Sequence, residues 1–111
     1  MFTNRKQWTE AREHCSSLGR RLLEIRTPND LYRASQVYTE INSGGTTVGL
    51  WLGGHRSNFG DEFKWISNGD PINVNDNFWF VSNNAYSNCV ALYQRLRYSA
   101  FCSTRMGYAC E

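Results

Sequence analysis

The sequence lacks long hydrophobic runs, and none approaches the roughly 18 consecutive apolar residues of a membrane-spanning helix. It also lacks a strong excess of charge, because 12 Lys and Arg against 10 Asp and Glu give a formal net charge of +2. A dedicated nucleic-acid-binding domain usually has a pI above about 9 and gathers its basic residues on one face. Neither a membrane span nor nucleic-acid binding is therefore predicted.

Histidine is scarce, which limits the catalytic chemistry open to the chain. The only two histidines are His14 and His55. No Cys or Ser nucleophile is recognisably paired with either of them, and no acid/base pair stands out elsewhere. Both histidines are interpreted as structural, and we do not expect an enzyme.

Carboxylates are missing from one long stretch, since no Asp or Glu occurs between Asn77 and Cys110. Calcium in proteins takes about six to eight oxygen ligands, several of them from carboxylates. A calcium site in this stretch is not predicted. Four carboxylates that precede Asn77 could form an auxiliary calcium site elsewhere, although they are preferably interpreted as solvated turn residues. They are Asp61, Glu62, Asp70 and Asp76.

The four cysteines form neither Cys-x-x-Cys pairs nor a Cys/His array with zinc spacing. They therefore indicate two disulfides in an oxidising, extracellular compartment rather than a metal site. No apolar signal segment follows Met1, so Met1 is interpreted as the start of a fragment of a secreted protein. Three disulfide connectivities are possible, and spacing alone does not select one.

Helix signals are confined to the first part of the chain, whose 111 residues correspond to about one domain. Asn4 and Gln7 have the spacing of a capping box, and an amphipathic helix is predicted from there to Gly19. A second helix is predicted over residues 28–42, with Pro28 at its first position.

Short strands are predicted after Ser43-Gly44-Gly45, over residues 48–53, 63–65, 89–94, 96–102 and 108–111. Helices followed by strands indicate an α+β fold. Residues 67–88 are rich in Asn and are expected to form a long irregular loop, where binding residues are often found. Its aromatic residues Phe78, Trp79 and Phe80 are expected to anchor the loop, or in one case to stack on a sugar.

Basic residues alternate along the strand predicted near residues 95–100. Alternation places Arg95, Arg97 and Ser99 on one face, which we expect to point away from the core. This face is either a solvated sheet surface or a contact for an anionic glycan or an acidic protein patch.

An ordered set of motifs resembles the C-type lectin-like domain. The motifs are Trp8-x-x-Ala11-x-x-x-Cys15, Trp51-Leu52-Gly53, Phe63-Lys64-Trp65, Cys89-Val90-Ala91-Leu92, and Cys102 with Tyr108-Ala109-Cys110-Glu111. The resemblance covers nearly the whole chain as a single domain over residues 1–111, and it is strongest to secreted invertebrate members.

The resemblance implies the disulfides Cys15–Cys110 and Cys89–Cys102. It also implies a first strand that pairs with the C-terminal strand. Only Phe2 is expected to remain of that first strand, which would be truncated and would leave one edge of residues 108–111 unpaired.

The calcium motifs of this family are replaced here. The family places a Glu-Pro-Asn or Gln-Pro-Asp triplet in the long loop and a Trp-Asn-Asp triplet before the third cysteine. This chain has Ser82-Asn83-Asn84, or one residue later Asn83-Asn84-Ala85, and Arg97-Tyr98-Ser99. No calcium or other cofactor is therefore expected.

The resemblance implies a binding module. The first hypothesis is that the module binds a glycan or glycoprotein, which can be anionic, at a site that does not require calcium. The alternative hypothesis is a protein-interaction module that binds no sugar. The predicted ligand-binding residues are Ser82, Asn83, Asn84, Arg95, Arg97, Tyr98 and Ser99.

Overall fold

The computed structural model describes residues 2–45, 48–58, 60–73, 79–80 and 86–111. Its two helices are α1 (Trp8–Ser17) and α2 (Pro28–Ile41). Its strands are β1 (Phe2–Lys6), β2 (Leu50–His55), β3 (Lys64–Trp65), β4 (Trp79–Phe80), β5 (Cys89–Tyr93), β6 (Leu96–Ala100) and β7 (Met106–Tyr108). The strands lie in the order β1-β7-β2-β5-β6-β4, with β3 paired to β2. The α+β prediction is confirmed.

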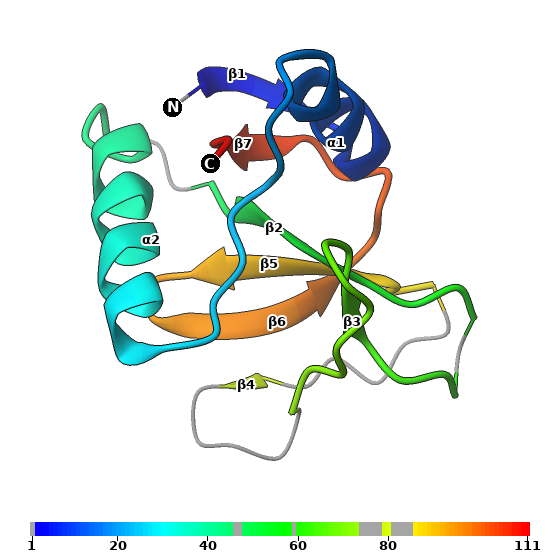
Figure 1. Ribbon diagram of the computed structural model, residues 1–111. Coiled ribbons are helices and arrows are strands. Elements are labelled where there is room, and N and C mark those ends of the chain that lie inside the picture. The colour runs from blue at the N-terminus through cyan, green and yellow to red at the C-terminus, as the bar shows by residue number, and fades with distance from the viewer. Residues whose placement is uncertain (1, 46–47, 59, 74–78, 81–85) are drawn as a thin grey trace.

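The two helices lie on different sides of the molecule and pack into different hydrophobic clusters (Figure 1). Helix α2 lies beside the end of the β5–β6 hairpin, whereas α1 lies near β1 and β7. The two ends of the described chain lie near each other, beside β1 and β7. Neither described helix has the length and apolar character needed to cross a bilayer.

Helix α1 begins later than predicted. Its N-cap is Gln7, which exchanges side-chain and backbone hydrogen bonds with Glu10, so the predicted cap at Asn4 is wrong. The helix ends as predicted, because Gly19 takes a positive φ of 70°. The backbone amide of Arg20 donates to the Cys15 carbonyl at 2.9 Å, and Gly19 donates to Ser16. These two bonds satisfy carbonyls that the helix end would otherwise leave without partners.

Residues 2–6 form β1 instead of the predicted helix start. Phe2 is paired with Tyr108 and Lys6 with Met106 in an antiparallel ladder. The other edge of β7 is occupied by β2, through the parallel pair Leu50–Gly107. The expectations that only Phe2 remains of the first strand and that the last strand has an unpaired edge are therefore wrong.

Helix α2 follows its local sequence signals closely. The Thr27 side chain accepts a hydrogen bond from the Asp30 amide at 3.2 Å, and the Asp30 carboxylate accepts one from the Thr27 amide. Pro28 occupies the start of the helix, where a missing N–H costs nothing. The C-cap residue Asn42 then holds the next segment, because its side-chain oxygen accepts from the Val48 amide at 2.6 Å.

The alternation of residues along the central strands produces a separate hydrophobic cluster on each face of the sheet. Trp51 and Ala91 are cross-strand partners within the cluster that contains residues of α1. Leu50 and Leu92 are partners within the cluster that contains residues of α2. All four side chains have no solvent exposure. The sheet is thus buried on both faces at its centre.

Two disulfides cross-link the helices and strands. Cys15–Cys110 joins α1 to the C-terminal segment, and Cys89–Cys102 joins the start of β5 to the residues after β6. The Cα atoms are 5.4 and 5.2 Å apart, within the usual range for disulfides. The pairing implied by the resemblance is confirmed.

Candidate functional site

The long loop contributes one described strand to the candidate site. Strand β4 pairs in parallel with β6, matching Trp79 with Arg97 and Phe80 with Tyr98. The predicted binding residues Ser82, Asn83 and Asn84 lie outside the described residues. The fold therefore brings a part of the long loop onto the edge of the strand that carries the other predicted binding residues.

The basic face predicted for β6 does not point into solvent. Arg97 is 8% exposed and Ser99 is 4% exposed. They do alternate as predicted, but their cross-strand partners are Leu92 and Val90, which belong to the buried cluster on the α2 face. The expectation that this face points away from the core is therefore wrong for Arg97 and Ser99. Arg95 alone of the three is exposed.

Tyr98 points to the opposite face of β6 and is half-buried against the α1-side cluster. Its hydroxyl donates to the Met106 sulfur at 3.6 Å. The hydroxyl also lies close to the backbone of Gly49, where a Cβ atom would lie only 2.7 Å from it. Burial, with smaller contributions from Tyr38 and Tyr93, raises the pKa of Tyr98 to about 12.

We expect the Tyr98 phenol to titrate near pH 12, above the ordinary pKa of 10.0. Because the folded-state pKa is raised, the neutral phenol stabilises the fold fully below the unfolded-state pKa, and this stabilisation is lost as pH rises through the folded-state pKa. Phenolate absorbance should therefore show a late step that is absent from Tyr98→Phe. If Tyr98→Phe instead lost a step near pH 10, this result would contradict the burial of the Tyr98 hydroxyl.

Arg95 lies in the tight turn between β5 and β6, next to α2. The residue before it, Gln94, has a φ of 57°, which is uncommon for a residue other than glycine. The ring of Tyr93 meets the ring of Tyr38 of α2 edge to face, with centroids 5.9 Å apart. Tyr38 is itself buried, which raises the pKa of its phenol. The turn is therefore held against the helix by an aromatic contact.

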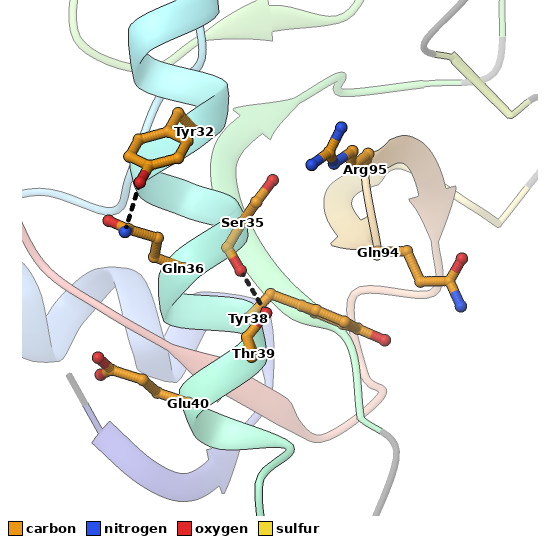
Figure 2. Close-up of a pocket in the computed structure, with 8 residues that line it drawn as sticks. All are labelled: Tyr32, Ser35, Gln36, Tyr38, Thr39, Glu40, Gln94 and Arg95. Carbon is orange, nitrogen blue, oxygen red and sulfur yellow. Dashed lines mark hydrogen bonds between the residues drawn. The ribbon is translucent and has the colours of Figure 1, made fainter.

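A groove of about 550 Å³ lies between α2 and this turn. Figure 2 shows Tyr32 and Gln36 on one side of the helix, and Ser35 pointing toward Arg95 across the groove. The Gln36 amide donates to the Tyr32 hydroxyl at 3.0 Å. The residues that line the groove are Tyr32, Ser35, Gln36, Tyr38, Thr39, Glu40, Gln94 and Arg95.

The sequence analysis did not identify this groove, although it singled out Arg95. Tyr32 was the available signal, because it lies off the apolar stripe of α2 formed by Leu31, Ala34 and Tyr38. Such a residue indicates binding only where it joins other exposed apolar side chains in a patch, which the sequence alone does not show.

The acidic residues considered for an auxiliary calcium site have different surroundings. Asp70 accepts a hydrogen bond from Arg26 Nη1 at 2.6 Å, which lowers the pKa of Asp70. Asp61 and Glu62 are exposed, and Asp76 lies outside the described residues. Within the described residues, no group of three or more His, Cys, Asp or Glu side chains is placed to hold a metal ion.

Both histidines make packing contacts in the described structure. His14 Nδ1 shares a hydrogen bond with the Tyr108 hydroxyl and so links α1 to β7. His55 stacks on Trp8 with ring centroids 4.8 Å apart, and burial lowers its pKa. These contacts tie α1 to the sheet, as expected for structural histidines.

Residues 4–111 match the model of the family described as the Lectin C-type domain. The rat oxidized low-density lipoprotein receptor 1 is 33% identical over 72 residues, which cover 65% of this chain and 18% of the receptor. The chain thus corresponds to less than a fifth of that relative's length.

Solved structures with the same fold have low sequence identity to this chain. A calcium-dependent type II antifreeze protein in its calcium-free form has a TM-score of 0.73 at 15% identity, covering 96% of this chain and 84% of its own. The cow CD23 carbohydrate-recognition domain, studied with a GlcNAc2Man3 oligosaccharide, has a TM-score of 0.71 at 22% identity, covering 96% and 79%. The domain of the mouse scavenger receptor C-type lectin has a TM-score of 0.75 at 15% identity, covering 96% and 80%.

Proposed function

The chain belongs to the C-type lectin domain family, and from this premise we propose that it is a non-catalytic module that recognises a glycan without calcium at the family's usual site. Its two disulfides suit an oxidising compartment, and we propose that the module is secreted. The proposed glycan-contacting groups are the loop residues Ser82, Asn83 and Asn84.

The observation that carries calcium independence is the placement of Arg97. This residue stands where the resemblance places the first residue of the calcium triplet, and its guanidinium belongs to a buried residue of β6. A permanently charged guanidinium repels a divalent cation, and the repulsion is stronger away from bulk water. The chain also offers no carboxylate between Asn77 and Cys110 to offset that charge.

Glycan recognition is supported by the amide-rich loop and by the family's solved structures. The cow CD23 domain with the same fold was studied in the presence of an oligosaccharide. Side-chain amides can both donate and accept hydrogen bonds, as sugar hydroxyls require. Asn83 and Asn84 therefore offer a way to bind a sugar without a metal ion.

The alternative of a protein-binding module has its own supporting observation. The groove between α2 and the β5–β6 turn is lined by tyrosines and one arginine, and residues of these two types are enriched at protein–protein hot spots. The two functions depend on different residues, so a single chain can have both.

Calcium is expected to leave the thermal unfolding midpoint unchanged. A ligand present at about 1,000 times its Kd would stabilise the folded state by about 4 kcal/mol, which is a shift of many degrees for a domain of this size. We expect no such shift when millimolar calcium is added or when a chelator is used. A calcium-dependent rise that is lost in Asn83→Ala/Asn84→Ala would contradict the proposal. A rise lost in Asp61→Asn/Glu62→Gln would instead locate an auxiliary site.

A glycan array probed with and without chelator tests the proposed function directly. Binding should be equal in the two conditions and should be lost in the Asn83→Ala/Asn84→Ala variant. The Asn68→Ala variant is a control for the loss of an exposed side-chain amide at the start of the same loop. Binding that requires calcium, or the absence of any glycan binding, would refute the proposal.

A further inference from the structure

The groove between α2 and the β5–β6 turn has the size of a ligand site. Its volume of about 550 Å³ lies within the roughly 300–1,000 Å³ typical of binding pockets. A smaller hollow of about 140 Å³ shares Tyr32, Ser35 and Arg95 with the groove and extends it toward Pro28 at the start of α2. The depression therefore runs along most of the helix.

A second hollow with a different character adjoins the groove through their shared residue Gln94. It has a volume of about 430 Å³ and is lined by Tyr93, Gln94, Leu96 and Tyr98. Its wall is almost entirely apolar. The β5–β6 turn thus separates a mixed polar and aromatic groove from an apolar hollow.

Exposed apolar side chains gather around this turn. Tyr32 is 61% exposed, Tyr93 is 42% exposed and Leu96 is 37% exposed. All three side chains line the hollows just described. Clustered exposed apolar residues mark interaction surfaces more often than scattered ones do.

Arg95 places a positive charge in the polar and aromatic groove and in its smaller extension toward Pro28. Its side chain forms no ion pair or hydrogen bond with any residue in the described part of the chain. Two other arginines differ from Arg95, because Arg33 pairs with Asp30 at 2.8 Å and Arg26 pairs with Asp70 at 2.6 Å. Arg95 is therefore available to an external carboxylate.

The turn that presents Arg95 has a fixed shape. Gln94 holds a left-handed backbone conformation that costs free energy for a residue with a side chain. The edge-to-face contact of Tyr38 with Tyr93 fastens the same turn to α2. A ligand would therefore meet a surface that is already ordered, which lowers the entropy cost of binding.

We propose that this face, formed by α2 and the β5–β6 turn, binds an acidic and apolar segment of a partner protein. A carboxylate of the segment pairs with Arg95 beside the ring of Tyr32, and an adjacent apolar side chain enters the hollow lined by Tyr93, Leu96 and Tyr98. A peptide fits this combination better than a sugar, because an apolar hollow leaves sugar hydroxyls without hydrogen-bond partners. The inference does not rest on glycan binding by the long loop.

The experiment uses the oxidised protein as bait for a displayed library of random peptides. Selected peptides should combine Asp or Glu with a nearby aliphatic or aromatic residue. The affinity of a selected peptide should fall about tenfold in Arg95→Gln, since a hydrogen bond to a charged group is lost. It should fall similarly in Leu96→Ser, and it should weaken as the salt concentration rises.

Two matched variants control for charge and for apolar surface in general. Arg20→Gln removes another exposed arginine, and Leu18→Ser removes another exposed leucine, both just after α1. Both control variants should bind the selected peptide as tightly as the unmodified protein does. The two test variants and the two controls should all have a thermal unfolding midpoint within a few degrees of that of the unmodified protein.

Three outcomes would overturn the inference: no enriched peptides, enriched peptides without acidic residues, or peptide binding that Arg95→Gln and Leu96→Ser leave unchanged. Loss of array binding to anionic glycans in Arg95→Gln, without any peptide selected, would assign the face to a glycan instead. Glycan binding that depends on Asn83 and Asn84 is measured separately, so failure of one proposal is distinguishable from failure of the other.

Discussion

Loss of the Cys15–Cys110 disulfide is expected to destabilise the domain more than any other single change described above. The bond closes a loop with a sequence separation of 95 residues. In the chain-entropy model such a loop corresponds to about 4.7 kcal/mol of stability. A domain of this kind has a total free energy of unfolding of about 5–15 kcal/mol. The Cys15→Ala/Cys110→Ala variant should therefore be largely unfolded or should melt at a much lower temperature.

The shorter disulfide provides the comparison within the same chain. Cys89–Cys102 spans a separation of 13 residues, for which the model gives about 3 kcal/mol. Urea unfolding followed by circular dichroism should place Cys89→Ala/Cys102→Ala between the unmodified protein and Cys15→Ala/Cys110→Ala. Reduction of both disulfides should have the largest effect. An unchanged unfolding midpoint after full reduction would refute this account.

Replacement of Glu24 by Ala is expected to produce the second large loss of stability. Glu24 is 4% exposed although it carries a carboxylate. Its oxygens accept hydrogen bonds from the Ser67 amide at 3.0 Å, the Ser67 hydroxyl at 2.7 Å and Arg26 Nη2 at 3.0 Å. These bonds join the segment before α2 to the turn that follows β3.

The Glu24→Ala change removes the acceptor for all three donors. Breaking a buried charge pair costs about 3–5 kcal/mol, but Arg26 is partly exposed and can regain water, so we expect about 2–3 kcal/mol. Glu13→Ala, on the exposed face of α1, should change stability by less than about 0.5 kcal/mol. Urea unfolding measures both variants, and equal midpoints would show that the Glu24 network does not stabilise the fold.

Much of the framework could be predicted from sequence because its signals are local. The cap at Thr27 with Pro28 and Asp30 depends on hydrogen bonds within one helical turn, and α2 begins where these residues place it. The positive φ of Gly19 similarly ends α1 within its own last turn. The disulfide pairing was not local and came from the resemblance to the family.

Errors arose where distant segments compete with local preferences. Asn4 has a plausible capping pattern, yet residues 2–6 pair with β7, about one hundred positions away, because a strand ladder satisfies several backbone groups at once. The edge of the C-terminal strand that was expected to be unpaired is occupied for the same reason, since β7 pairs with both β1 and β2.

The candidate site shows most clearly which features follow from the sequence and which follow from the tertiary structure. The period-2 pattern by itself determined that Arg97 and Ser99 share one face of β6, because side chains alternate in any strand. Only the tertiary structure decided that this face is buried with Val90 and Leu92, since that depends on where the sheet packs. Only the tertiary structure likewise placed Arg95 across a groove from Tyr32, because α2 and the β5–β6 turn meet through long-range packing that no local pattern encodes.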